Sequence, residues 1–148
     1  MKRSTLIGIL LLLTPVLQAQ VPVDAIRAAL ATSRISFHFS FMMETDLAPI
    51  KCEGDALAQG NCYRVNALGL EYYCDGTTRW TVDRESKEVY VESTTGVEEF
   101  LVNPEKYLGA MRNLDYSGLQ QLPYSEDTAA FSFDTSALDA SWVVTDLR

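Results

Sequence analysis

Few side chains in this sequence have the types and spacing that catalysis requires. The 148-residue chain has one histidine, His38, which cannot build a histidine-rich metal site. A Cys–His nucleophile pair could form, but no motif brings the two residue types together. Several carboxylates lie around turns, where Asp accepts backbone hydrogen bonds, and a glycosidase-type acid pair among them is a minor alternative. These carboxylates are Asp75, Asp83, Glu85 and Glu88. We therefore expect no catalytic residues, no metal and no cofactor.

Two of the three cysteines could form a disulfide instead. If residues 67–69 are a three-residue hairpin loop, Asn66 lies opposite Leu70 and Cys62 lies opposite Cys74. Two opposed cysteines on neighbouring strands can bridge when their geometry allows it. The alternative is that each cysteine is a small buried apolar residue. The odd number leaves at least one thiol unpaired.

The sequence does concentrate aromatic and aliphatic residues at alternate positions. In residues 35–43 every second side chain is apolar, which is typical of a strand with one apolar face. The pattern recurs in residues 78–82 and 89–91. Such faces either pack a core or line a cavity for an apolar ligand. The residues we expect to line such a cavity are Phe37, Phe39, Phe41, Tyr63, Tyr72, Trp80, Val82, Val89 and Val91.

The first half of the chain predicts one helix and a meander of short strands. Residues 21–34 favour an amphipathic helix, with Pro22 in its first turn. Gly60-Asn61 predicts a hairpin between two strands, and Asp75-Gly76 predicts another turn.

The second half predicts a helix and two more strands. Asn103 and Pro104 would begin a helix over residues 103–113. Residues 129–137 and 140–147 favour strands. The order of elements therefore predicts an α+β domain with a curved antiparallel sheet.

The N-terminus predicts export. Residues 1–19 have the parts of a signal peptide: basic Lys2 and Arg3, a short apolar run and a small residue, Ala19, at the cut. The mature chain would be a single domain of residues 20–148, soluble in the periplasm. Without the two signal-peptide cations it has 10 basic against 20 acidic residues. This negative charge disfavours binding to nucleic acid.

Several of these features occur in an order that resembles a known family. Arg64 lies in "CYRV", Asp75-Gly76 precedes Trp80, and Asp83 and a valine-rich strand follow. The later "VNPEKYL" adds an Asn-Pro helix start. Over residues 22 to about 110 the chain resembles a short, divergent member of the periplasmic outer-membrane lipoprotein carrier family, the LolA type. The resemblance implies an open, incomplete β-barrel with helices packed across its concave face.

The resemblance also implies a function. Such a carrier shields acyl chains of lipoproteins, or another lipid, in an apolar cavity and moves them towards the outer membrane. Its partners would be an inner-membrane release complex and an outer-membrane receptor, and Arg64 would act in lid closure and transfer. We expect a monomer. The alternative is a non-enzymatic periplasmic binding or sensor module on the same fold that engages a protein partner.

Overall fold

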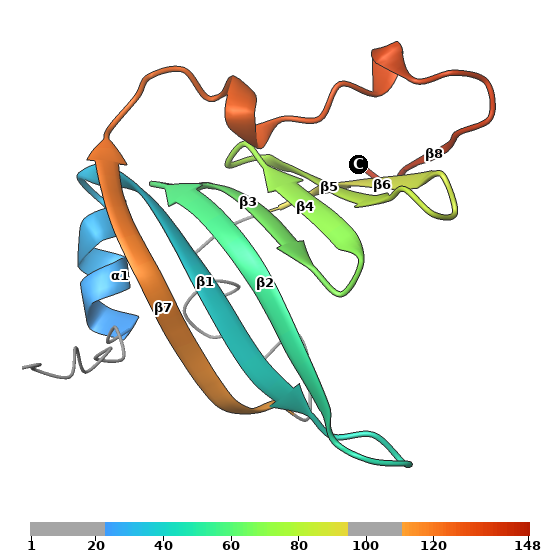
Figure 1. Cartoon of the computed structure of the whole chain (residues 1–148). Coiled ribbons are helices and arrows are strands. Elements are labelled where there is room, and N and C mark those ends of the chain that lie inside the picture. Colours follow the sequence, from blue (N-terminus) through green and yellow to red (C-terminus); the bar gives the residue numbers. More distant parts are fainter. Residues whose placement is uncertain (1–22, 95–110) are drawn as a thin grey trace, which may run out of the picture.

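The computed structural model describes residues 23–94 and 111–148. Their strands form one sheet in the order β7-β1-β2-β3-β4-β5-β6-β8 (Figure 1). All neighbouring pairs are antiparallel except β6–β8, which is parallel. The elements are α1 (Val23–Leu30), β1 (Ser33–Met43), β2 (Ile50–Gln59), β3 (Cys62–Ala67), β4 (Leu70–Cys74), β5 (Thr78–Asp83), β6 (Glu88–Ser93), β7 (Met111–Pro123), the 3-10 helices η1 (Ala129–Phe131) and η2 (Thr135–Ala137), and β8 (Val143–Asp146).

The predicted α+β fold, an open barrel with helices across its concave face, is wrong for the described residues. They form a predominantly β structure in which the eight-residue α1 is the one α-helix. The predicted signal peptide and most of the predicted helix over 103–113 lie outside the described residues, and residues 111–113 belong to β7.

The C-terminal region combines a wrong and a correct prediction. The strand predicted over 129–137 is replaced by η1 and η2. Aspartate side chains accept backbone N–H groups at both turns: Asp127 accepts from Ala129, and Asp134, the N-cap of η2, accepts from Ser136, each at 2.9 Å. These local bonds compete with strand pairing. The strand predicted over 140–147 is confirmed as the shorter β8, and the helix and meander of the first half are confirmed in type.

The sheet buries one face in its first half and the opposite face in its second half. Residues directly opposite in a ladder share a face, so the registers assign each side chain to one of two faces. We call the face that packs on α1 the helix face. Its core comes from α1, β1, β2, β3, β4 and β7, and consists of Ile26, Ala29, Leu30, Ile35, Phe37, Ala56, Ala58, Tyr63, Val65, Cys74 and Tyr116.

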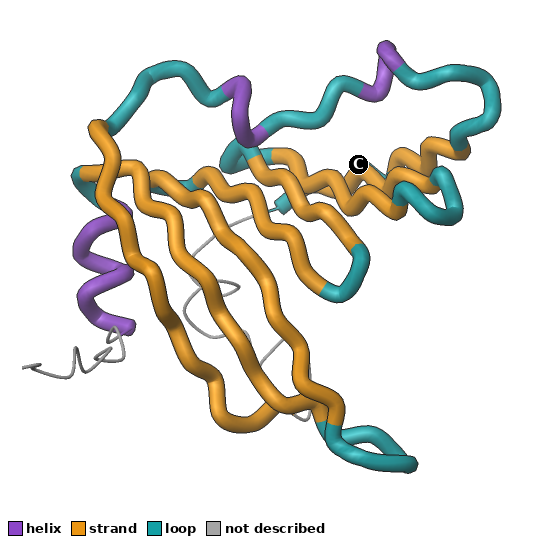
Figure 2. The backbone as a smooth tube through the Cα atoms, in the orientation of Figure 1, coloured by secondary structure: helices purple, strands orange, loops and turns teal. Residues whose placement is uncertain are grey.

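The opposite face is covered by residues 124–142, which we call the strap. The strap leaves the end of β7, passes over β4–β6 and leads into β8, mostly as loop (Figure 2). We call this side of the sheet the strap face. Its core consists of Tyr73, Val82, Val89 and Val91, packed against Trp80, Phe133, Leu138 and Trp142.

The change of face depends on the hairpin between β3 and β4. The observed register places Ala67 opposite Leu70, so the loop has two residues, Leu68 and Gly69, and not the three predicted. Both have positive φ, 56° and 77°, as type I′ hairpin turns require. A leucine in this conformation is unusual, because its Cβ crowds the backbone.

We predict that Leu68→Asn stabilises the protein by about 0.5–1 kcal/mol, since asparagine tolerates positive φ far better than leucine does. Urea unfolding would measure the change. Leu47→Asn is the matched control, because Leu47 is a loop leucine that is 98% exposed and has no positive φ. Equal stabilisation by both changes would refute a contribution from turn strain.

The strap is anchored to the sheet through Gln59, which is 2% exposed. Its Oε1 accepts from the Ser125 N–H at 2.9 Å and from Arg34 Nε at 3.2 Å. Its Nε2 donates to the Ser125 carbonyl at 2.6 Å. Arg34 also donates to the Asp127 carbonyl and lies 5.0 Å from the Phe131 ring centroid. The buried amide of Gln59 thus fixes the start of the strap, because it both donates to and accepts from the backbone of Ser125.

We predict that Gln59→Ala lowers the free energy of unfolding by about 2–4 kcal/mol, because three hydrogen bonds are lost and backbone groups of Ser125 lose their partner. Gln121→Ala, at an exposed position of β7, should change it by less than about 0.5 kcal/mol. Denaturant titration gives both values. Similar small effects at the two positions would mean that the anchor contributes nothing.

Candidate ligand-binding surface

Five of the nine residues expected to line a cavity share the helix face. Phe37, Phe39 and Phe41 alternate along β1, and the registers place Tyr63 and Tyr72 on the same side. The Phe37 ring meets Tyr116 edge-on, with centroids 5.5 Å apart. The rings of Phe39 and Phe41 stack at 6.3 Å. The aromatic alternation read from the sequence therefore puts these five side chains on one face, where Phe37, Phe41 and Tyr63 are buried and Phe39 and Tyr72 are partly buried.

Helix α1 is too short to cover that surface. Eight helical residues span about 12 Å, whereas the eleven residues of β1 span about 36 Å. The Gly60 N–H donates to the Leu30 carbonyl at 2.8 Å, which fixes the end of α1 beside the β2–β3 hairpin. On this face Phe41 and Cys52, beyond Phe39, are buried, whereas five other apolar side chains are only partly buried. We call them the apolar row: Phe39, Ala67, Leu70, Tyr72 and Leu119.

The Phe39 ring lies directly on the backbone of β2. Gly54 is opposite Phe39 in β1 and opposite Ala67 in β3. A Cβ at Gly54 would collide with the Phe39 ring and would lie 2.6 Å from the Asn66 carbonyl oxygen. Glycine is required because the ring occupies the space of a side chain. The tip of the Phe39 ring therefore lies against the backbone of β2 at Gly54.

The other four expected cavity residues lie on the strap face. Trp80 is opposite Tyr73 and Val91, and Val82 is opposite Val89. Tyr73 follows Tyr72 in β4, so it points to the other side of the sheet. The sheet therefore separates this group from the β1 aromatics, and the nine residues do not line one cavity.

Arg64, the expected lid residue, also lies on the strap face. It is opposite Tyr73, and its guanidinium carbon is 5.1 Å from that ring centroid. Its side chain is exposed, on the side of the sheet away from α1. The described residues give Arg64 no contact with the helix that partly covers the aromatic surface.

The cysteines do not form the expected pair. The two-residue loop places Cys74 opposite Tyr63, while Cys62 pairs with Gln59 on the other neighbouring strand. The predicted opposition of Cys62 and Cys74 is therefore wrong by one residue. Both are buried free thiols, as is Cys52. Burial raises the pKa of the Cys62 and Cys74 thiols, which keeps them protonated and poorly nucleophilic.

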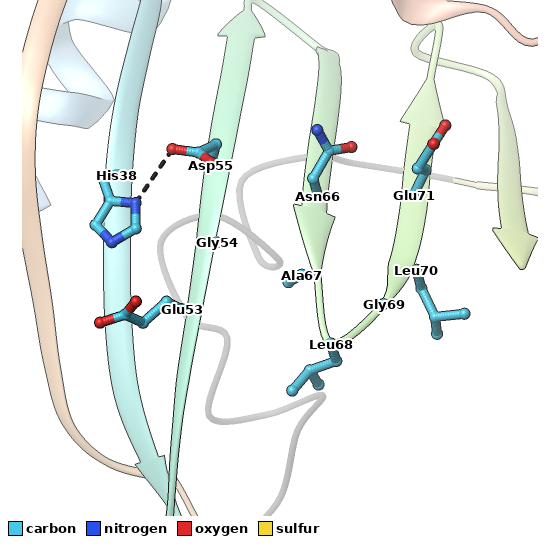
Figure 3. A pocket seen from close by; sticks show the side chains of 10 residues that line it. All are labelled: His38, Glu53, Gly54, Asp55, Asn66, Ala67, Leu68, Gly69, Leu70 and Glu71. Carbon is cyan, nitrogen blue, oxygen red and sulfur yellow. Dashed lines mark hydrogen bonds and ion pairs between the residues drawn. The ribbon is translucent and has the colours of Figure 1, made fainter. Parts of the chain in front are cut away.

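Sequence reasoning missed a polar pocket of about 440 Å³ on the strap face (Figure 3). His38, Asp55, Asn66 and Glu71 come from four neighbouring strands and form one row across the sheet. His38 Nδ1 lies 3.1 Å from Asp55 Oδ1, with side chains 41% and 76% exposed. The pocket lining contains no Ser, Thr, Cys or Lys nucleophile. Only the strand registers, which the sequence does not supply, reveal this row.

The carboxylate Glu71 in this row is held by a specific ion pair. Arg84 donates to both of its oxygens, at 2.5 and 3.0 Å, and the Tyr73 hydroxyl donates to it at 2.7 Å. The hydrogen bonds from Arg84 hold the pKa of Glu71 below its usual value. The Arg84 guanidinium carbon is 5.9 Å from the Phe133 ring centroid, so the pair also contacts the strap. Glu71 is thus a structural carboxylate.

The turn carboxylates behave as expected from their positions. Asp75 accepts from the N–H groups of Thr77 and Thr78. Asp83 accepts from the N–H groups of Glu85 and Ser86. Among the described residues, no group of three or more His, Cys, Asp or Glu side chains could hold a metal ion. No helix within 23–94 or 111–148 has the length and apolar character needed to cross a membrane.

Comparison of the sequence with protein-family models finds no matching family. Comparison with curated proteins finds no significant match. The resemblance to the carrier family therefore depends on the motifs alone.

We predict that Glu71→Gln lowers stability by about 1 kcal/mol near neutral pH, because the bidentate pair with Arg84 is lost. The folded-state pKa of Glu71 is depressed. Its stabilisation is therefore present above the unfolded value of 4.5 and is lost as the pH falls below it. Urea unfolding at a series of pH values should show wild type and variant converging below pH 4.5.

Glu85→Gln is the control for this prediction. Glu85 is exposed in the β5–β6 loop, and its replacement should leave the pH dependence of stability unchanged. A difference between wild type and Glu71→Gln that stays constant down to strongly acidic pH would contradict the assigned role of the carboxylate.

Proposed function

We propose that this protein is a periplasmic carrier that binds an acyl chain on its helix face and shields it from water. The observation that carries the proposal is the apolar row on the helix face, whose five side chains are only partly buried. Contiguous apolar surface of this kind marks a ligand or partner site in a soluble protein. The cargo would be the acyl chains of lipoproteins, or another lipid.

The chemistry of the apolar row suits such a ligand. Four of its residues are hydrocarbon side chains, and the fifth, Tyr72, has a pKa that burial raises, so it stays neutral. Each buried methylene contributes about 0.8 kcal/mol to binding. A long acyl chain would therefore bind after the costs of immobilisation are met, with no polar contact required. No catalytic step is part of this proposal.

Transport would require export, loading and release. Residues 1–19 would direct export, and an inner-membrane release complex and an outer-membrane receptor would be the partners. Arg64 lies on the other face, so we assign it no contact with the cargo. The second candidate function is a module that uses the same apolar row to engage a protein partner, because such a surface fits an apolar side chain as well as a lipid.

We predict that Phe39→Gln weakens binding of a fluorescent long-chain fatty acid by roughly 10- to 100-fold, the equivalent of losing one aromatic contact. Trp80→Gln, which changes a partly buried aromatic residue on the strap face, should leave affinity within about twofold, because its contacts lie across the sheet. Fluorescence titration measures both affinities, and circular dichroism checks that each variant is folded.

Two outcomes would contradict the carrier. Equal loss in both folded variants would mean that the helix face is not the binding surface. Absence of fatty-acid binding by the wild type, together with no lipid found by native mass spectrometry of the isolated protein, would favour the protein-partner alternative.

A further inference from the structure

The last strand presents an exposed apolar cluster at one edge of the sheet. The registers place Val143 opposite Glu88, and Thr145 opposite Tyr90, on the helix face. Leu147 follows two residues later on the same side. Val143 is 58% exposed, Leu147 61% and Tyr90 40%. This cluster is separate from the apolar row on β7, β1, β3 and β4, and the proposed cargo binding does not use it.

The outer edge of β8 also has backbone groups available for pairing. The N–H groups of Val143 and Leu147 donate to the Lys87 and Val91 carbonyls of the β6 side, at 2.9 and 2.8 Å. Alternate residues of a strand direct their N–H and C=O groups to opposite sides. Val144 and Asp146 therefore direct theirs away from β6. In the described part of the chain, no strand lies on that side of β8.

We propose that two copies of this chain associate through antiparallel pairing of β8 with β8 about a two-fold axis at Thr145. In this register Val144 of each copy forms the hydrogen-bonded pair with the other copy's Asp146. Val143 of each copy faces the other copy's Leu147, on the helix face. The cluster is then buried twice, once on each side of the axis, as a two-fold interface requires.

Side-chain chemistry selects this register over its neighbours. Val144 and Asp146 direct their backbone groups away from β6, so each must pair with one of these two residues in the other copy. The two-fold axis could therefore also pass through Val144 or through Asp146. An axis at Asp146 would oppose two like charges, which destabilises a strand pair. An axis at Val144 would leave both Leu147 side chains without an apolar partner. Asp146 is also ion-paired with Arg148 at 2.7 Å, so the edge adds no net charge to the interface.

The two edges of the sheet differ in a way that supports this assignment. β7, at the other edge, has two register shifts against β1, and positive φ at Asn113 and Gly118. Such irregularities protect an edge from pairing with another chain. β8 is only four residues long, but it pairs with β6 in an unbroken register and has no bulge or positive φ. A second copy is the occupant that the self-complementary sequence of β8 fits.

Sedimentation of the full chain, from micromolar to near-millimolar concentration, tests the proposal. We expect a monomer–dimer equilibrium. The dissociation constant of the dimer should be at least tenfold higher for Val143→Lys than for the wild type. Val144→Lys is the matched control: it faces Asp146 of the other copy and should retain the dimer. A wild-type protein that is monomeric at all concentrations, or a Val143→Lys variant that dimerises like wild type, would overturn the proposal.

A cysteine crosslink tests the position of the axis. At Thr145 the two copies would form a non-hydrogen-bonded pair with Cα atoms about 4.5 Å apart, within the range of a disulfide. Under mild oxidation Thr145→Cys should give a covalent dimer, whereas Val144→Cys and wild type, whose own cysteines are buried, should not. Equal crosslinking in all three would overturn the register.

Discussion

The two-residue turn at Leu68-Gly69 determines which face of the sheet each following strand buries. A strand alternates its side chains with a period of two, so one extra loop residue would turn every later side chain over. With a three-residue loop, Tyr73 would lie opposite Tyr63, and Trp80 would follow it to the helix face. The observed turn places Tyr73 and Trp80 on the strap face instead. The left-handed backbone at Leu68 is the local cost of this arrangement.

Strand β4 is where the two cores meet, and it is apolar on both sides for that reason. Tyr72 and Cys74 point to the helix face and Tyr73 to the strap face. On either side of β4 the face opposite each core carries polar pairs: His38 and Asp55 on the strap face, and Arg79 and Glu92 on the helix face. Helix α1 packs on one half of the sheet and the strap packs on the opposite face of the other half.

Much of the local structure was predictable from the sequence. Alternation in residues 35–43, the Gly60-Asn61 hairpin and the Asp75-Gly76 turn each depend on residues close in the chain, and each prediction is correct in type. The aromatic surface of Phe37, Phe39 and Phe41 followed from the same alternation. What could not be predicted was which strands share a face, because that depends on loop length. Leu68 gave no signal for a type I′ turn, since leucine is rare there. The strand prediction for residues 129–137 was wrong because Phe131 and Phe133 alternate as they would in a strand, while Asp127 and Asp134 bond the nearby backbone instead.

The Gln59–Ser125 pairing has a consequence for how the chain acquires its structure. These residues are 66 positions apart, and the second core is complete only when Trp142 is in place. A chain synthesised from its N-terminus can therefore assemble the α1-covered half first, while Val82, Val89 and Val91 are still exposed to water. Contacts between residues this distant in sequence form slowly. Until they form, the exposed apolar strands can aggregate or pair incorrectly. The last two dozen residues act as the closing step of folding, and a chain truncated before the strap would leave one half of its sheet bare.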